Sequence, residues 1–96
     1  MATETTDYDV ADYLTSPARI AAYLELALED GDPKSIATAL GTVARAKGMT
    51  QLAKDTGLSR EALYRALAPE GNPTLATFAA VLDALGLEMR IGRKAA

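Results

Sequence analysis

The stretch GLSREALYRAL, residues 57–67, contains several side chains that can form directional hydrogen bonds with an anionic surface. Ser59 can cap a helix there, and Leu63 and Leu67 lie four residues apart, so both fall on one face of that helix. With the leucines turned inward, the helix turns four polar side chains outward: Arg60, Glu61, Tyr64 and Arg65. A helix face of this composition is suited to binding an anionic surface and is not typical of an enzyme.

Each of these side chains has a matching group on double-stranded DNA. Arg60 can grip guanine O6 and N7 in a bidentate contact, and Glu61 can accept a hydrogen bond from a cytosine amine. Tyr64 can lie against a thymine methyl or bind a phosphate through its hydroxyl, and Ser59 can reach a base or a phosphate. Arg65 lies farther along the helix, where we expect it to pair with the phosphate backbone.

The neighbouring residues complete a helix-turn-helix pattern over 50–68. A short helix, TQLAKDT, precedes Gly57, and Gly57 supplies the left-handed backbone that a tight turn needs. Gln51 and Lys54 on that first helix are candidate phosphate contacts. The N–H groups of a helix that starts near Thr74 are further candidates.

Two other interpretations of the same residues remain open. Glu61 and Arg65 have the spacing of an ordinary surface ion pair, worth about 0.2–0.5 kcal/mol. Tyr64 can instead be a half-buried packing residue, and the two-helix spacing also occurs in plain helical bundles.

The elements that position these groups are predicted to be helical, which makes the chain an all-α protein. Ser16-Pro17 and Asp32-Pro33 each combine a capping residue with a proline suited to a first turn. We predict five helices in a lambda-repressor-like arrangement, the last opened by Thr74 with Leu75 and Phe78 turned inward. Residues 16–96 then form one DNA-binding domain, and residues 1–15 form an acidic N-terminal segment.

The last piece, LEMRI (87–91), alternates apolar and polar residues as a β-strand does. A solitary strand has an open edge, so Leu87, Met89 and Ile91 are candidates for pairing with a second copy of the chain. Packing of exposed apolar helix surface is the other route to a homodimer. A tail that alternates by chance is the third interpretation.

Charge is divided unevenly along the 96 residues. Residues 1–33 hold one Arg and eight acids, a net charge of −7, whereas residues 34–96 hold nine Lys and Arg and five acids, a net charge of +4. The overall charge of −3 therefore does not exclude a nucleic-acid partner for the basic part. The acidic part can face a basic partner or be only a solvated segment.

Composition excludes several classes of protein. The chain has no His and no Cys, which removes the usual general base, the thiol nucleophile and most zinc sites. We predict no enzyme activity, no cofactor and no small-molecule substrate. No apolar run approaches the roughly 20 residues of a membrane span. The N-terminus MATETTDYD lacks a signal-peptide pattern, so we expect a cytoplasmic location.

The sequence from about residue 8 to residue 91 resembles the HigA-like addiction-module antidote proteins. The segments that carry the resemblance are ALEDGDP, ARAKGMTQLA, GLSREALYRAL and PEGNPTLATF, which follow one another in the family's order. The resemblance implies an antitoxin of a type II toxin–antitoxin pair. Such a protein binds a small RelE/ParE-like toxin and represses its own operon as a dimer on its operator.

The acidic N-terminal third suits such a toxin, because toxins of this kind are commonly basic. We therefore assign toxin binding to the apolar and aromatic residues of that third: Tyr8, Val10, Tyr13, Leu14, Ile20, Tyr23 and Leu24.

Two alternative functions stay open. The chain can be an interaction module that neutralises a toxin without specific DNA binding, or a phage-type repressor that has no toxin.

Overall fold

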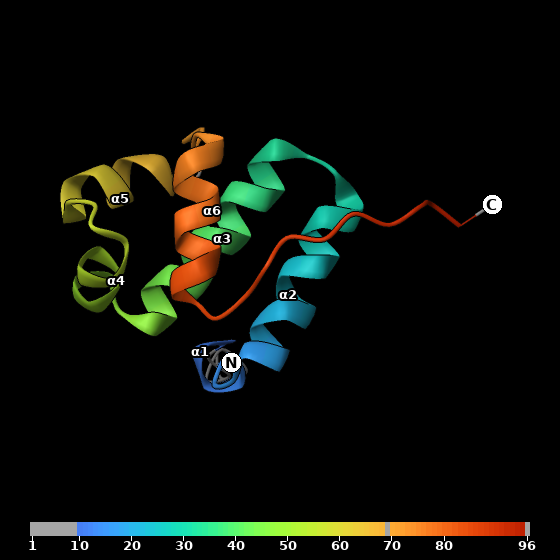
Figure 1. The fold of residues 1–96 in the computed structure, drawn as a ribbon, viewed down its shortest axis with the longest axis horizontal. Helices are drawn as coiled ribbons and strands as arrows, with labels where there is room; N and C mark the ends of the chain where they lie inside the picture. Colours follow the sequence, from blue (N-terminus) through green and yellow to red (C-terminus); the bar gives the residue numbers. More distant parts are fainter. Residues whose placement is uncertain (1–9, 69, 96) are drawn as a thin grey trace, which may run out of the picture.

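The computed structural model describes residues 10–68 and 70–95, which confirm the all-α prediction. They contain α1 (Val10–Tyr13), α2 (Pro17–Asp30), α3 (Pro33–Lys47), α4 (Met49–Thr56), α5 (Arg60–Ala66) and α6 (Leu75–Ala84). Figure 1 shows α4 and α5 at one end of the molecule and α2 at the other, with α3 and α6 between them. None of the helices in this part of the chain is long and apolar enough to cross a bilayer.

The two cap-and-proline signals start helices as predicted. Ser16 accepts a hydrogen bond from the Arg19 N–H at 3.2 Å before α2, and Asp32 accepts one from the Lys34 N–H at 3.1 Å before α3. Each bond satisfies a backbone donor that has no partner inside the helix, and the proline that follows needs none. Local chemistry therefore defines where these two long helices begin.

The helix count differs from the prediction because α1 adds a sixth helix before Ser16. This single turn lies in the segment assigned to residues 1–15, of which residues 1–9 fall outside the described part. Arg19 of α2 lies 5.4 Å from the centre of the Tyr13 ring, a cation–π contact that links α1 to α2.

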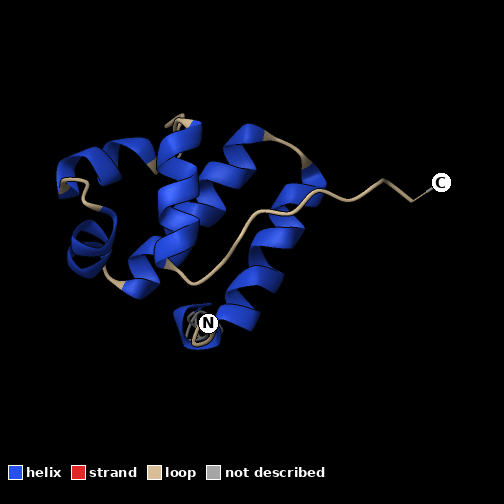
Figure 2. Cartoon of the chain, viewed as in Figure 1, coloured by secondary structure: helices blue, strands red, loops and turns tan. Residues whose placement is uncertain are grey.

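The C-terminal strand is absent, so the prediction for residues 87–91 was wrong. Figure 2 shows this segment as irregular chain, and no strand occurs anywhere in residues 10–68 and 70–95. Leu87 is half-buried against the core, but Met89 is 51% exposed and Ile91 is fully exposed. The alternation favours an extended backbone, yet a strand also needs a ladder partner, and the described part of the chain does not provide one.

The core lies along α3. Its fully buried side chains come from α3 to α6: Leu40, Val43, Leu52, Leu63, Leu67 and Val81. Gly41 lets the backbone after α5 approach α3 closely, because a methyl group at this position would lie 2.6 Å from the Leu67 carbonyl oxygen. The core thus fixes α5 from its inner face.

Leu75 is the second departure from prediction. We expected it to face inward with Phe78, but its side chain is 73% exposed. Leu75 is the first residue of α6, so it extends beyond the edge of the core that Val81 and Leu82 fill. The outward position of Leu75 places an exposed apolar group directly after Thr74, the N-cap of α6.

Candidate nucleic-acid interface

The turn between α4 and α5 is built from Gly57, Leu58 and Ser59. Gly57 has a φ of 79°, the left-handed conformation expected there, and its N–H donates to the Ala53 carbonyl at 2.9 Å. The Leu58 N–H donates to the Thr56 hydroxyl at 3.2 Å. These bonds satisfy the backbone around the turn, which fixes the angle at which α5 leaves α4.

The inner face of α5 is fully packed, whereas its outer face is open. Leu63 and Leu67, at the helix and its C-cap, are 0% and 2% exposed, as their spacing predicted. The four polar residues of the outer face are all exposed: Arg60, Glu61, Tyr64 and Arg65. The helix therefore presents two cations, one anion and one phenol from a backbone that its leucines hold in place.

Ser59 has a structural role at the start of α5. Its Oγ accepts the Ala62 N–H at 3.0 Å, which makes it the N-cap of α5. The hydroxyl proton is still available for a partner, because the cap bond uses Ser59 only as an acceptor. Arg60 and Glu61 lie in the first turn that this cap holds.

The proposed ion pair between Glu61 and Arg65 does not form. The structure records no salt bridge between these two side chains, although both are fully within its described part. Tyr64 is 48% exposed, with its outer half available to a partner. Within the described residues, none of these three side chains has a hydrogen bond or an ion pair to break before it engages an external ligand.

The two candidate phosphate contacts on α4, Gln51 and Lys54, differ in their internal hydrogen bonding. Gln51 donates its side-chain amide to the Asp55 carboxylate at 2.9 Å, one turn along α4. Lys54 is exposed in the last turn of the same helix. Lys54 thus offers an unengaged cation, while Gln51 must share its amide with Asp55.

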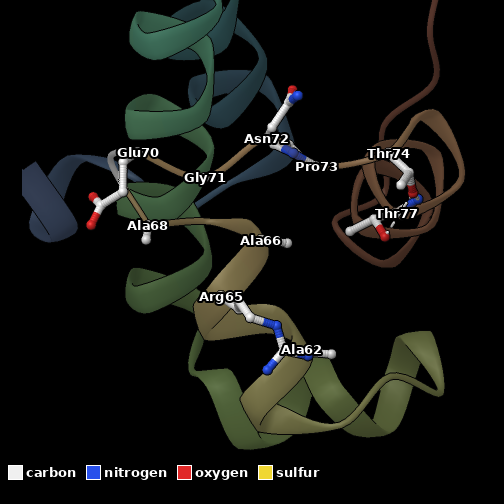
Figure 3. A pocket seen from close by; sticks show the side chains of 10 residues that line it. All are labelled: Ala62, Arg65, Ala66, Ala68, Glu70, Gly71, Asn72, Pro73, Thr74 and Thr77. Atoms are coloured by element: carbon white, nitrogen blue, oxygen red, sulfur yellow. Dashed lines mark hydrogen bonds between the residues drawn. The ribbon is translucent and has the colours of Figure 1, made fainter.

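An open cleft of about 460 Å³ separates the end of α5 from the start of α6. Figure 3 shows Arg65 on the α5 side and Thr74 and Thr77 on the α6 side, with Glu70 on the opposite side of the cleft from the two threonines. Thr74 caps α6 by accepting the Thr77 N–H at 3.1 Å. Arg65 and Thr74 were predicted from the sequence, whereas Thr77 was not, although the Thr-x-x-Thr spacing at a helix start could have indicated it.

The residues assigned to toxin binding divide by burial. Leu14, Ile20 and Leu24 are 6–8% exposed and belong to the core, so they can act only by holding α1 and α2 in position. Val10, Tyr13 and Tyr23 are half-buried and keep part of their surface open. Tyr8 lies outside the described residues.

Charge separates the two ends of the molecule. Residues 45–65, which include α4 and α5, carry five basic and two acidic side chains, a net charge of +3. Residues 17–32, which include α2, carry one basic and four acidic side chains, a net charge of −3. An anionic ligand is therefore attracted to the α4–α5 end and repelled from α2.

Residues 4–93 match the family model described as probable addiction module antidote protein. The chain belongs to this family. A protein of Haemophilus influenzae (strain ATCC 51907 / DSM 11121 / KW20 / Rd), known only as an uncharacterized protein, is 47% identical over 85 residues, which cover 88% of each chain. No solved structure matches the sequence. An antidote family implies a toxin partner, and the match does not distinguish HigA-like members from other antidotes.

Proposed function

We propose that this antidote protein neutralises a small RelE/ParE-like toxin by direct binding and represses its own operon by sequence-specific binding to DNA. The antidote family supports the first activity. The observation that carries the second is the outer face of α5, where Arg60, Glu61, Tyr64 and Arg65 are exposed on a helix with a fully buried inner face. A rigid helix with free polar groups is what reading base edges requires.

In this proposal α5 enters the major groove of the operator. Arg60, at the first position of the helix, contacts guanine, and Glu61 accepts from a cytosine amine. Tyr64 packs its exposed half against a thymine methyl or donates its hydroxyl to a phosphate. The N-terminal half of α5 thus carries the base contacts, as in other recognition helices.

The backbone of the DNA is held beside α5. Arg65 and the start of α6 form the two sides of the cleft, and the Leu75 and Ala76 N–H groups are first-turn donors without an acceptor inside the helix. A phosphate in the cleft would pair with Arg65 and accept from these donors. Lys54 and Gln51 contact a further phosphate, and Ser59 can donate its hydroxyl proton to another.

The toxin binds at the other end of the molecule. The half-buried side chains of Val10, Tyr13 and Tyr23, together with Tyr8, form the proposed contact, and Leu14, Ile20 and Leu24 support it from the core. The net charge of −3 on residues 17–32 favours a basic toxin.

The repressor acts as a homodimer in this proposal. Two copies of α5 reach two half-sites of the operator, which raises affinity over a single copy. Met89 and Ile91 are exposed in each chain and are the proposed dimer contacts, with Leu87 anchoring the segment to the core.

The test is a pair of double variants with the same spacing on two different helices. Arg60→Ala/Tyr64→Ala removes the outer contacts of α5. Arg19→Ala/Tyr23→Ala, with the same separation on α2, removes the proposed toxin contact Tyr23 and the cation that lies against Tyr13, another proposed contact. Fluorescence anisotropy with the duplex upstream of the gene and with a scrambled duplex measures DNA affinity. Calorimetry with the small protein encoded beside the gene measures toxin affinity.

We expect Arg60→Ala/Tyr64→Ala to lose the preference for the upstream duplex and to keep toxin binding. Arg19→Ala/Tyr23→Ala should show the reverse pattern. Equal affinity of the unaltered protein for both duplexes at two salt concentrations would reject the repressor activity and leave a toxin-binding module. Absence of any toxin binding would instead favour a repressor that has no toxin.

A further inference from the structure

The C-terminal tail, residues 87–95, leaves the core after its first residue. Leu87 is half-buried, but every residue from Glu88 to Ala95 is exposed. The tail starts beside the N-terminal end of α2, because a methyl group on Gly86 would lie 3.7 Å from Pro17 Cγ. Its side chains comprise three basic residues and one acidic residue, a net charge of +2.

The tail has two chemically different sides. Arg90 Nη2 lies 2.6 Å from Glu88 Oε2, so these two side chains share one side. In an extended backbone the intervening Met89, and with it Ile91, points to the opposite side. Ile91 is fully exposed and Met89 is 51% exposed, so the described part of the chain leaves Ile91 uncovered and about half of Met89 open.

The outer face of α2 has the complementary composition. Leu26 is 67% exposed, and the exposed Ala22 lies one turn before it on the same face. Glu25, Glu29 and Asp30 are exposed around and beyond Leu26. The face therefore offers a small apolar strip with carboxylates beside it, and its one basic residue, Arg19, lies at the opposite end of α2 against the Tyr13 ring.

The acids at the end of α2 also lack a compensating charge. Glu29 and Asp30 lie in the last turn, where the helix dipole is negative, and this turn contains no basic residue. A cation placed there by a partner would interact favourably with both the dipole and the carboxylates. This end of α2 is thus the position at which an incoming Arg or Lys gains most.

We propose that the tail of a second copy of this chain lies along α2, and that the two chains exchange tails reciprocally. Met89 and Ile91 of one copy pack on the Ala22 and Leu26 strip of the other. Side chains on one side of an extended backbone repeat about every 6.6 Å, and the four residues from Ala22 to Leu26 advance about 6 Å along the helix, so the two sets of side chains match in spacing.

This register carries the basic end of the tail to the acidic end of the helix. When Ile91 lies near Leu26 and the tail runs in the same direction as α2, Arg93 and Lys94 reach Glu29 and Asp30. Contacts between like surfaces are disfavoured, because two α2 faces would bring acids together and two tails would bring cations together. A reciprocal exchange is the symmetric arrangement in which each contact pairs opposite charges.

The inference rests on the homodimer of the proposed function, but it does not depend on DNA or toxin. Sedimentation equilibrium of the free full-length chain tests it. A monomer that still binds the operator and the toxin would overturn the exchanged tail and the homodimer, and would leave the proposed operator and toxin binding intact.

The first experiment compares Leu26→Asp and Ile91→Asp with Leu75→Asp. Leu75 is the matched control, because it is a leucine of similar exposure that belongs to α6 and not to α2 or the tail, and because the dimer is measured in the absence of DNA. We expect the dimer dissociation constant to rise at least about tenfold in the first two variants and to stay unchanged in the third. Circular dichroism confirms that each variant keeps its helices.

The second experiment exchanges charges between the two surfaces. Glu29→Lys/Asp30→Lys places cations on α2, and Arg93→Glu/Lys94→Glu places acids on the tail. Each variant alone should be monomeric, because its two contacts then pair like charges. Mixing the two variants should restore a dimer made of one chain of each kind, in which both contacts again pair opposite charges.

Three results would overturn the inference. One is a monomeric unaltered chain at about 100 µM, where a dimer with a micromolar dissociation constant is almost fully associated. Another is dissociation by Ile91→Asp without any effect of Leu26→Asp, which would mean that tails pair with each other or dock away from α2. The third is loss of toxin binding by Leu26→Asp in a chain that stays dimeric, which would assign the α2 face to the toxin.

Discussion

Helices α5 and α2 begin in the same way and end up with opposite surfaces. Each has a serine N-cap and buries aliphatic side chains on its inner face, Leu63 in α5 and Ile20 and Leu24 in α2. The outer face of α5 carries the two arginines, the glutamate and the tyrosine that we propose to contact DNA, whereas the outer face of α2 carries Leu26 and carboxylates. The residues that determine folding are alike, so the functional difference between the helices resides in side chains that folding leaves unconstrained.

The two helices also lie at opposite ends of the molecule (Figure 1). We therefore expect DNA bound at α5 and a protein partner bound at α2 not to compete for the same surface.

Breaking the close approach between α3 and the backbone after α5 should affect the proposed DNA-binding end most. In Gly41→Ala the new methyl group would lie 2.6 Å from the Leu67 carbonyl oxygen, so α5 must shift away from α3. The substitution gains about 1 kcal/mol of helix propensity, but overpacking of this kind typically costs about 1–3 kcal/mol. We expect lower stability in urea denaturation and a loss of operator affinity, measured by anisotropy, that exceeds the loss of stability.

Gly92→Ala is the matched control for this substitution. No atom lies within 4 Å of a methyl group on Gly92, which is in the C-terminal tail. Its stability and operator affinity should equal those of the unaltered chain. A Gly41→Ala protein with unchanged DNA affinity would show that α5 does not need this contact to keep its position.

The serine caps of the two helices allow the same test at a smaller scale. Ser59 and Ser16 accept backbone N–H groups at 3.0 and 3.2 Å, so replacing either with Ala should cost about 1 kcal/mol of stability. Only Ser59→Ala should also weaken operator binding, because its cap holds the turn that carries Arg60 and Glu61. Urea denaturation and anisotropy on both variants measure the two effects, and equal DNA affinities would contradict the assignment of α5.

Local signals predicted the helices well. Ser16-Pro17, Asp32-Pro33 and Gly57 each determine the backbone within a few residues, and the structure has helix starts and a left-handed turn at these positions. The strand at 87–91 and the inward position of Leu75 were wrong, because both depend on neighbours distant in sequence. Alternation does not supply a ladder partner, and apolar spacing does not show where the core ends.

The same difference between local and distant determinants decides how much of the candidate site could be predicted from the sequence. The outward direction of Arg60 and Tyr64 follows from the burial of Leu63 on the same helix, so the sequence contained it. The cleft that joins Arg65 to Thr74 and Thr77 depends on how α6 returns beside α5, which no local pattern reports. The burial of Ile20 and Leu24, assigned to a partner surface, likewise became visible only in the packed molecule.

Two lysines at opposite ends of the molecule allow the most sensitive comparison. Lys54 is exposed on α4, beside the proposed DNA surface, and Lys34 is exposed at the start of α3, where it lines a cleft with Tyr23 of α2. A lysine that neutralises one phosphate releases about one counterion, so Lys54→Ala should reduce the slope of log affinity against log salt by about 1. The loss should be similar for the operator and for scrambled DNA, since a phosphate contact carries no sequence information. Lys34→Ala should leave the slope unchanged, and equal slopes for the two variants would mean that DNA is attracted by the overall charge of the chain and not held at α4 and α5.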